Sequence, residues 1–295
     1  MKETLTILQA VEWAVRHLRQ NQVLHPRFSA MSLVAHALGI DPLNLHLRFN
    51  RALKTGELKR IQGYLRRRCG HEPLEYILGE AYFFGLPFKV SPAVLRPRPE
   101  TGQLVEMALE HLSKAPKERR LVLDLGTGCG NIAVTIAKYL PCRIWAVDIS
   151  GPALAAAKAN ARRLGVANSL NWRRGSWFSA LKPSDPAQFE VIVCNPPYIA
   201  SPARELLNPE IAWHEPPVAI YGGKTGLEPY RTMARGLAQR LAPGGMALME
   251  LEPNRAQRVS AFFKGRELKR SFGRDDAGVN RVLVLKKSGD STGIK

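Results

Sequence analysis

The stretch Leu121-Val122-Leu123-Asp124-Leu125-Gly126-Thr127-Gly128-Cys129-Gly130 decides the fold of this chain of 295 residues. Its first five residues are apolar apart from Asp124, as in a buried strand. Glycines at alternate positions follow, and without a Cβ the backbone can turn sharply and approach a ligand closely. Residues 131–140 then have the pattern of a helix. The stretch therefore predicts a strand, a glycine loop and a helix, the opening unit of a nucleotide-binding α/β sheet.

Strand and helix patterns alternate through the chain after this unit. The series predicts a Rossmann-like, doubly wound α/β sheet with helices on both faces, and its last two strands predict an antiparallel edge. The expected strands are residues 143–147, 169–173, 189–194, 246–251, 267–272 and 281–285, and the expected helices are 152–164, 227–241 and 255–263.

The residues before the sheet have a different pattern. Residues 5–20 and 55–69 place apolar side chains at helical spacing, and Ser29 can cap a further helix that runs to Leu38. Strand-like spacing follows around the turn Gly85-Leu86-Pro87. We therefore expect four parts, which are a helical domain at 1–80, a β-hairpin linker at 81–98, the α/β domain at 99–287 and a flexible tail at 288–295.

The formal net charge of +18 is the unusual feature of the composition. It favours an acidic partner, or a partner that itself sits on nucleic acid such as ribosomal RNA. A solvated basic surface explains the same charge, so both interpretations stay open. No long apolar run or secretory signal is present, so we expect a cytoplasmic protein with no membrane contact. The spacing of the four cysteines fits no metal site, so we expect buried thiols.

Asp148 ends the strand after the glycine loop. An acid at that place can accept hydrogen bonds from both hydroxyls of a ribose, although it could instead cap the helix that follows. Hydride-transfer enzymes have the pattern GxGxxG, whereas here the third glycine, Gly130, comes one position earlier. No lysine follows the glycines, which excludes a P-loop. The loop with its preceding acid resembles that of class I S-adenosylmethionine methyltransferases.

Asn195-Pro196-Pro197-Tyr198 follows the apolar run 189–194, and two prolines force the chain to leave the sheet there. The Asn195 carboxamide oxygen and the Pro196 carbonyl are two acceptors that can hold one NH2 group by its two hydrogens. Tyr198 offers an aromatic face on which a flat group can stack. This arrangement suits methylation of a weakly nucleophilic, planar nitrogen, in an amide or in the exocyclic amine of a base. A plain Pro-rich turn is the alternative.

The wider chain, from about residue 25 to 285, resembles the HemK/PrmC family of peptide chain release factor glutamine N5-methyltransferases. Many short matches in one order carry the resemblance, beside the glycine loop, Asp148 and the tetrapeptide. They are His25-Pro26-Arg27, residues 33–39, Arg68, residues 72–79, 83–88, 96–101, 176–181 and 215–220, Gly226-Leu227, Asp276-Ala277-Gly278 and Arg281.

The resemblance implies S-adenosylmethionine as cofactor and a release factor as substrate. By this resemblance, the N-terminal helical domain would bind the release factor. The glutamine of the Gly-Gly-Gln loop of the release factor would then contact Asn195, Pro196, Pro197 and Tyr198. We expect a monomer and no metal. The implied cofactor residues are Gly126, Thr127, Gly128, Cys129, Gly130, Asp148, Trp177 and Asn195.

Three positions depart from the family pattern. Ser176 stands where an acid usually precedes the tryptophan, Gly102 follows Thr101 where the family has glutamate, and Glu252-Pro253 replaces a glycine-containing turn. These departures bear on affinity and partner specificity more than on the reaction. Other readings remain, namely methylation of a ribosomal-protein glutamine, of adenine N6 or guanine N2, or a non-catalytic cofactor-binding assembly factor.

Overall fold

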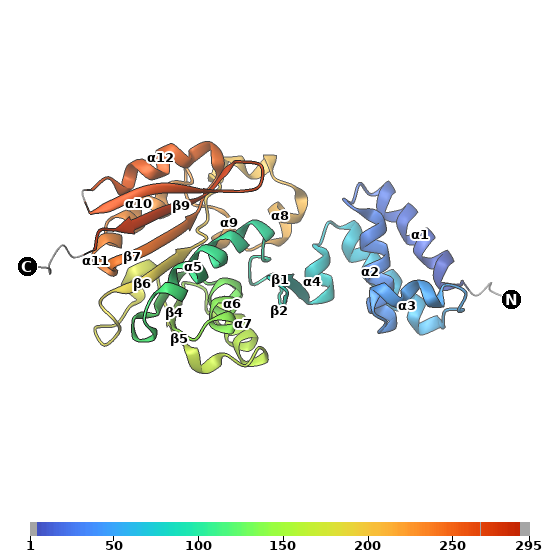
Figure 1. The fold of residues 1–295 in the computed structure, drawn as a ribbon. Coiled ribbons are helices and arrows are strands. Elements are labelled where there is room, and N and C mark those ends of the chain that lie inside the picture. Colours follow the sequence, from blue (N-terminus) through green and yellow to red (C-terminus); the bar gives the residue numbers. More distant parts are fainter. Residues whose placement is uncertain (1–4, 266, 290–295) are drawn as a thin grey trace, which may run out of the picture. The chain divides into compact units, whose positions relative to one another are not determined.

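The computed structural model describes residues 5–265 and 267–289, so most of the expected tail lies outside the described residues. The chain divides into two units. The N-terminal unit comprises Met1–Glu80 and Asn208–His214, and the sheet unit comprises Ala81–Leu207 and Glu215–Lys295 (Figure 1). A short segment from the second half of the sequence therefore belongs to the first unit.

Helices build the N-terminal unit around one apolar core. They are α1 (Ile7–Gln20), α2 (Pro26–Leu38), α3 (Thr55–Cys69), α4 (Leu74–Leu78) and α8 (Pro209–His214). Helix α1 begins at a capping box, in which the Thr6 hydroxyl accepts from Gln9 N and the Gln9 side chain accepts from Thr6 N. Leu18, Leu33 and Ile61 have no exposed surface, so the three longer helices share this core.

The expected cap at Ser29 is wrong. Helix α2 begins three residues earlier, because Pro26 occupies its first turn, where a missing N–H costs nothing and the fixed φ suits a helix. Ser29 is instead a buried residue inside the helix, and its hydroxyl oxygen accepts a hydrogen bond from Arg68 Nε at 3.4 Å.

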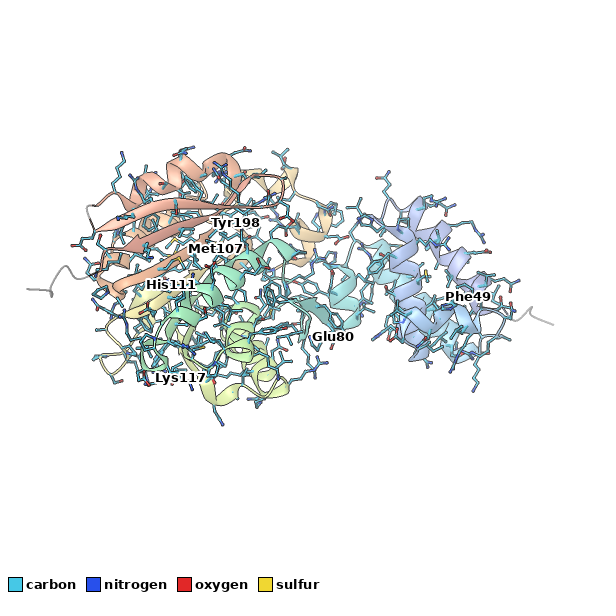
Figure 2. The ribbon with its side chains drawn as sticks, in the orientation of Figure 1. Phe49, Glu80, Met107, His111, Lys117 and Tyr198 are labelled. Atoms are coloured by element: carbon cyan, nitrogen blue, oxygen red, sulfur yellow. The ribbon has the colours of Figure 1, made fainter. Side chains whose placement is uncertain are left out.

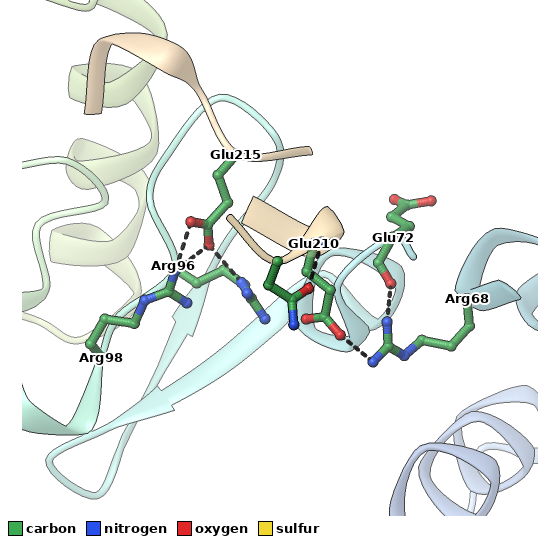
Figure 3. A network of polar contacts seen from close by, with 7 residues as sticks. Arg68, Glu72, Arg96, Arg98, Glu210 and Glu215 are labelled. Carbon is green, nitrogen blue, oxygen red and sulfur yellow. Dashed lines mark hydrogen bonds and ion pairs between the residues drawn. The ribbon is translucent and has the colours of Figure 1, made fainter. Parts of the chain in front are cut away.

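Helix α8 is held in the N-terminal unit by polar contacts. Arg68 is almost fully buried, donates to the carbonyl of Glu72 at 2.9 Å and forms an ion pair with Glu210 (Figure 3). His214 Nε2 lies 2.8 Å from the carbonyl oxygen of Gly70, and the rings of His71 and Trp213 meet edge to face.

The sheet unit is a doubly wound α/β fold, as expected. Strands β1 (Glu80–Phe83) and β2 (Leu86–Lys89) form the expected hairpin at its start, but its turn is Phe84-Gly85, since Leu86 and Pro87 already belong to β2. A seven-stranded sheet follows, in the order β5-β4-β3-β6-β7-β9-β8. The first five strands in this order are parallel, and β9 and β8 form the antiparallel edge. The strands are β3 (Leu121–Leu125), β4 (Arg143–Asp148), β5 (Leu170–Arg174), β6 (Phe189–Cys194), β7 (Leu241–Glu250), β8 (Leu268–Arg274) and β9 (Asn280–Lys287).

Helices cover both faces of this sheet, and each face has its own core. The first face packs against α5 (Gly102–Lys114), α6 (Asn131–Tyr139) and α7 (Gly151–Arg163). On this side Met107 of α5 contacts the core, and His111 Nε2 lies 3.0 Å from Glu190 Oε1 of β6 (Figure 2). The second face packs against α10 (Glu228–Ala234), α11 (Leu237–Arg240) and α12 (Ala256–Ser260). The remaining helix is α9 (Pro217–Ile220).

The helix expected at 227–241 is wrong in its continuity. It is broken between α10 and α11 at Gly236, the N-cap residue of α11, whose φ of −131° is not helical. An added Cβ at Gly236 would also lie 3.1 Å from a carbon of the Phe178 ring. The strand expected at 246–251 begins earlier, at Leu241. Leu241 pairs with Phe189, and the segment that contains Gly244 forms a bulge before pairing resumes at Met246.

The register of the parallel strands brings three loops to one edge. Leu125 pairs with both Val147 and Cys194, so β3, β4 and β6 end at the same level. The residues that follow these strands therefore meet at the carboxyl edge, where the strand order reverses and ligands bind in such sheets.

Candidate active site

The glycine loop leaves β3 in a tight turn. The N–H groups of Gly126 and Thr127 both donate to the carbonyl of Val147 at 2.9 Å, and the Thr127 hydroxyl donates to Asp124 Oδ2 at 2.6 Å. Burial raises the pKa of Asp124 to about 7, against the effect of the Thr127 bond. Gly130 begins α6 with φ 84°, where an added Cβ would press on Ala157 at 3.1 Å, so this glycine serves helix packing.

Asp148 holds the loop from the neighbouring strand. Its Oδ2 accepts from Gly128 N and its Oδ1 from Ser150 N, each at 2.8 Å. The cap of α7 is the Ser150 hydroxyl, which accepts from Ala153 N at 3.2 Å, so Asp148 is not the cap of that helix. Burial raises the pKa of Asp148. Each carboxylate oxygen keeps a second lone pair, which can accept from a ligand hydroxyl.

A cavity of about 270 Å³ opens between these loops, near the lower end of the roughly 300–1,000 Å³ typical of small-molecule sites. Five of the expected cofactor residues line it, together with Pro197 of the tetrapeptide, whereas Thr127, Cys129 and Gly130 do not. The lining is Leu95, Gly126, Gly128, Val147, Asp148, Ile149, Gly175, Ser176, Trp177, Asn195, Pro197, Val218, Ala219 and Tyr221.

The tetrapeptide stands at the end of β6 beside this cavity. Asn195 Nδ2 donates to Thr101 Oγ1 at 3.1 Å, and the Thr101 hydroxyl donates to Glu250 Oε2 at 2.6 Å. Tyr198 packs against the core of the second sheet face, and burial raises its pKa to about 12. The phenol is therefore neutral at physiological pH.

A second glycine-containing turn, residues 222–226, packs against the backbone of the tetrapeptide. A Cβ added at Gly222 would lie 2.3 Å from the carbonyl oxygen of Pro197, and one at Gly226 would lie 2.2 Å from that of Tyr198. Arg255 Nη1 donates to the carbonyl of Tyr198 at 3.1 Å and to that of Thr225 at 2.5 Å. The backbone of the tetrapeptide is therefore fixed by direct contact with the backbone of Gly222 and Gly226, which only residues without a Cβ allow.

An ion pair positions the segment that closes the cavity. Glu215 has no exposed side-chain surface and accepts from Arg96 at 2.7 Å and from Arg98 at 2.6 Å (Figure 3). The residues after it, Val218, Ala219 and Tyr221, line the cavity. These three residues are not among the expected cofactor residues, although the family match at 215–220 includes Val218 and Ala219.

The residues of the cavity fit S-adenosylmethionine. Leu95, Ile149 and Trp177 give the lining apolar and aromatic surface suited to an adenine ring. Open space lies in front of Gly128, where an added Cβ would meet nothing within 4 Å. The Tyr221 hydroxyl oxygen is buried and has no hydrogen-bond partner among the described residues, so a bound polar ligand can satisfy it.

The sheet order, the glycine loop with Asp148 and this cavity define a class I S-adenosylmethionine-dependent methyltransferase. Residues 9–79 match the PrmC N-terminal domain family, and residues 103–210 match the methyltransferase small domain family. The chain belongs to the release factor glutamine methyltransferase family.

Similar proteins support this assignment over most of the chain. A release factor glutamine methyltransferase of Geobacter sulfurreducens is 37% identical over 95% of this chain and 96% of its own length. One from Koribacter versatilis is 40% identical over 84% and 86%. Among solved structures, the hMettl16 catalytic domain with a MAT2A 3'UTR hairpin has a TM-score of 0.55 at 14% identity, covering 83% of this chain and 86% of that one. That likeness shows the fold alone.

None of the helices in the described ranges is long and apolar enough to cross a lipid bilayer. Within the same ranges, no group of three or more His, Cys, Asp or Glu side chains is arranged to hold a metal ion.

Proposed function

We propose that this protein methylates the side-chain amide nitrogen, N5, of the glutamine in the Gly-Gly-Gln motif of peptide chain release factors. The similar proteins, which are release factor glutamine methyltransferases, support the choice of substrate. The observation that carries the proposal is the hydrogen bond from Asn195 Nδ2 to Thr101, because it leaves Asn195 Oδ1 as an acceptor beside the cavity.

The proposed chemistry rests on holding a weak nucleophile. An amide nitrogen is unreactive because its lone pair is delocalised into the carbonyl group. Asn195 Oδ1 and the Pro196 carbonyl would each accept one hydrogen of the substrate NH2 group, which fixes its rotation and aims the nitrogen. Positioning of this kind can lower a barrier by up to about 7–11 kcal/mol.

S-adenosylmethionine supplies an electrophilic methyl group on a positively charged sulfur. Methyl transfer would form the nitrogen–carbon bond as the sulfur–carbon bond breaks, and it would move the positive charge to the substrate nitrogen. Asn195 Oδ1 and the Pro196 carbonyl favour that charge, and the nitrogen then releases one proton to water. No strong base is needed, since the charged amide is acidic. Pro197 and the neutral Tyr198 would pack against the flat substrate amide.

The remaining residues have supporting roles in this proposal. Gly126, Thr127, Gly128, Cys129 and Gly130 form the loop for the methionine end of the cofactor, Asp148 binds its ribose, and Trp177 stacks on its adenine. The helical domain at 1–80 would bind the release factor. The net charge of +18 suits a cytoplasmic monomer that works near ribosomal RNA.

One experiment tests the substrate. The protein is incubated with methyl-labelled S-adenosylmethionine and, separately, a release factor, ribosomal proteins or RNA. We expect label on the Gly-Gly-Gln glutamine, and none on a matched release factor in which that glutamine is replaced by alanine. Label that appears only on a ribosomal protein or on RNA would refute the proposal.

A further inference from the structure

Asn195 can act as proposed only if its carboxamide presents oxygen, not nitrogen, to the substrate. The two ends of a carboxamide have nearly the same shape, so packing alone does not choose between them. With the amide reversed, an NH2 group would face the NH2 group of the substrate, and no hydrogen bond could form. Some neighbouring group must therefore set the direction.

The contacts of Thr101 set that direction. A hydroxyl has a single hydrogen, and Thr101 lies between Asn195 at 3.1 Å and Glu250 at 2.6 Å. An ionised carboxylate can only accept, so the hydrogen goes to Glu250 and Thr101 must accept from Asn195. The Asn195 group beside Thr101 is then Nδ2, which turns Oδ1 away from Thr101.

Burial makes this arrangement specific. Thr101 and Glu250 are 1% and 5% exposed, so water does not compete strongly for their hydrogen bonds. Tyr230 donates to the backbone carbonyl of Glu250 at 2.8 Å, which fixes the end of β7 that carries this carboxylate. Thr101 is likewise fixed, immediately before the first turn of α5.

We propose that Thr101 and Glu250 form a positioning relay that orients the carboxamide of Asn195 for catalysis. The relay rests on the proposed function, since it serves the acceptor that holds the substrate amide. Neither Thr101 nor Glu250 is among the residues that line the cavity, so both act through Asn195.

The relay depends on the charge of Glu250. Burial raises the pKa of Glu250 to about 7, while the Thr101 bond and the charges of Arg98 and Arg281 lower it. A protonated Glu250 can donate to Thr101, whose own hydrogen is then free for Asn195 Oδ1, and the amide reverses. The other titratable groups that interact with Glu250 are Glu100, Cys194, Tyr198 and Tyr230.

The kinetic test compares Thr101→Val, which keeps the shape and removes the hydroxyl, with Thr101→Ser, which keeps the hydroxyl. We expect Thr101→Val to lower kcat for release-factor methylation about 100-fold, with the Kd for S-adenosylmethionine within about twofold of wild type. Thr101→Ser should restore most of kcat. The matched control is Thr135→Val, since Thr135 is fully buried and its hydroxyl has no partner in the described part of the chain.

The pH dependence separates orientation from general damage. The ratio of wild-type to Thr101→Val rates should fall as the pH drops below about 7, because only wild type loses the correct orientation. Asp124 and all other titrating groups are common to both proteins and cancel in the ratio. A kcat for Thr101→Val within threefold of wild type, or a ratio that stays constant with pH, would overturn the relay.

One readout needs no activity. In ¹⁵N-labelled protein, the side-chain NH2 signal of Asn195 is the one that disappears in Asn195→Ala. It should move and exchange faster with solvent in Thr101→Val, and an unchanged signal would overturn the relay. Wild-type protein that fails to methylate a release factor refutes the proposed function instead, and this measurement still decides the relay.

Discussion

Replacing Gly226 by alanine should displace the tetrapeptide Asn195-Pro196-Pro197-Tyr198, to which we assign the substrate amide. The new Cβ would lie 2.2 Å from the carbonyl oxygen of Tyr198 and 2.3 Å from Arg255 Nη1. Such atoms normally stay more than about 3 Å apart, so the two backbones must separate by about 1 Å. A shift of about 1 Å in a positioned group can cost about 100-fold in rate. We therefore expect kcat to fall about 100-fold.

The control for this variant is Gly278→Ala. Gly278 has nearly the same backbone, with φ 76° against 72° for Gly226, but an added Cβ meets nothing within 4 Å. Both substitutions incur the left-handed strain of roughly 1–2 kcal/mol, and only Gly226→Ala adds the collision. A third variant, Gly222→Ala, tests the collision alone. Its added Cβ would collide with the Pro197 carbonyl, and Gly222 has no positive φ that would add backbone strain.

The assay measures methyl transfer to a release factor under single-turnover conditions, with unfolding in urea as the stability readout. Gly278→Ala should lose stability and keep its rate, whereas Gly226→Ala and Gly222→Ala should lose rate. If Gly226→Ala and Gly278→Ala have the same rate, the bracing of the tetrapeptide by residues 222–226 is refuted.

Three further predictions concern other parts of the sheet unit. Asn195→Ala should lower kcat at least about 1,000-fold and leave the Kd for S-adenosylmethionine within twofold, measured by calorimetry, and near-normal turnover would contradict the clamp. Glu215→Gln should lower the free energy of unfolding, by at most about 3–5 kcal/mol, because it removes the buried negative charge that Arg96 and Arg98 contact; an unchanged urea midpoint would contradict this. The free energy of unfolding of the cofactor-free protein should fall as the pH rises from about 4 to 7, because the raised pKa of Asp124 means that the folded state binds the Asp124 proton more tightly than the unfolded state does. The contribution of Asp124 to this fall is at most about 4 kcal/mol. Urea unfolding of Asp124→Asn at several pH values should show a weaker pH dependence than wild type.

Much of the fold could be predicted because its signals are local. Alternating apolar runs predict the strands, and parallel strands must end at a common edge, which places Gly126, Asp148 and Asn195 together. The helix expected at 227–241 was wrong because the apolar spacing continues through Gly236, a residue that weakens helices and has a non-helical backbone here. The contact between Gly236 and the Phe178 ring could not be predicted, because the two residues are far apart in the chain.

The supporting contacts of the site were beyond the sequence. Thr101 and Asn195 are far apart in the chain, and a hydroxyl–amide bond has no sequence signature. Gly222 and Gly226 are needed because a side chain at either position would collide with a backbone carbonyl of the tetrapeptide. The sequence pattern does not show this collision, because it depends on how distant segments pack. The position of Asn195 at the end of a buried strand and beside the cavity could be predicted, because two prolines after a buried strand are a local signal.

The placement of α8 has a consequence for dividing the protein. The chain passes from the tetrapeptide through α8, which the ion pair with Arg68 ties to the N-terminal unit, before it returns to the sheet unit at Glu215. The two units are therefore not successive modules that a cut near residue 80 would separate. A fragment that starts near residue 80 would contain α8 without the N-terminal helices that α8 contacts. Helix α8 would then lie unsupported in the loop between the tetrapeptide and the cavity residues Val218, Ala219 and Tyr221. An exchange of N-terminal units between related proteins would therefore have to include α8.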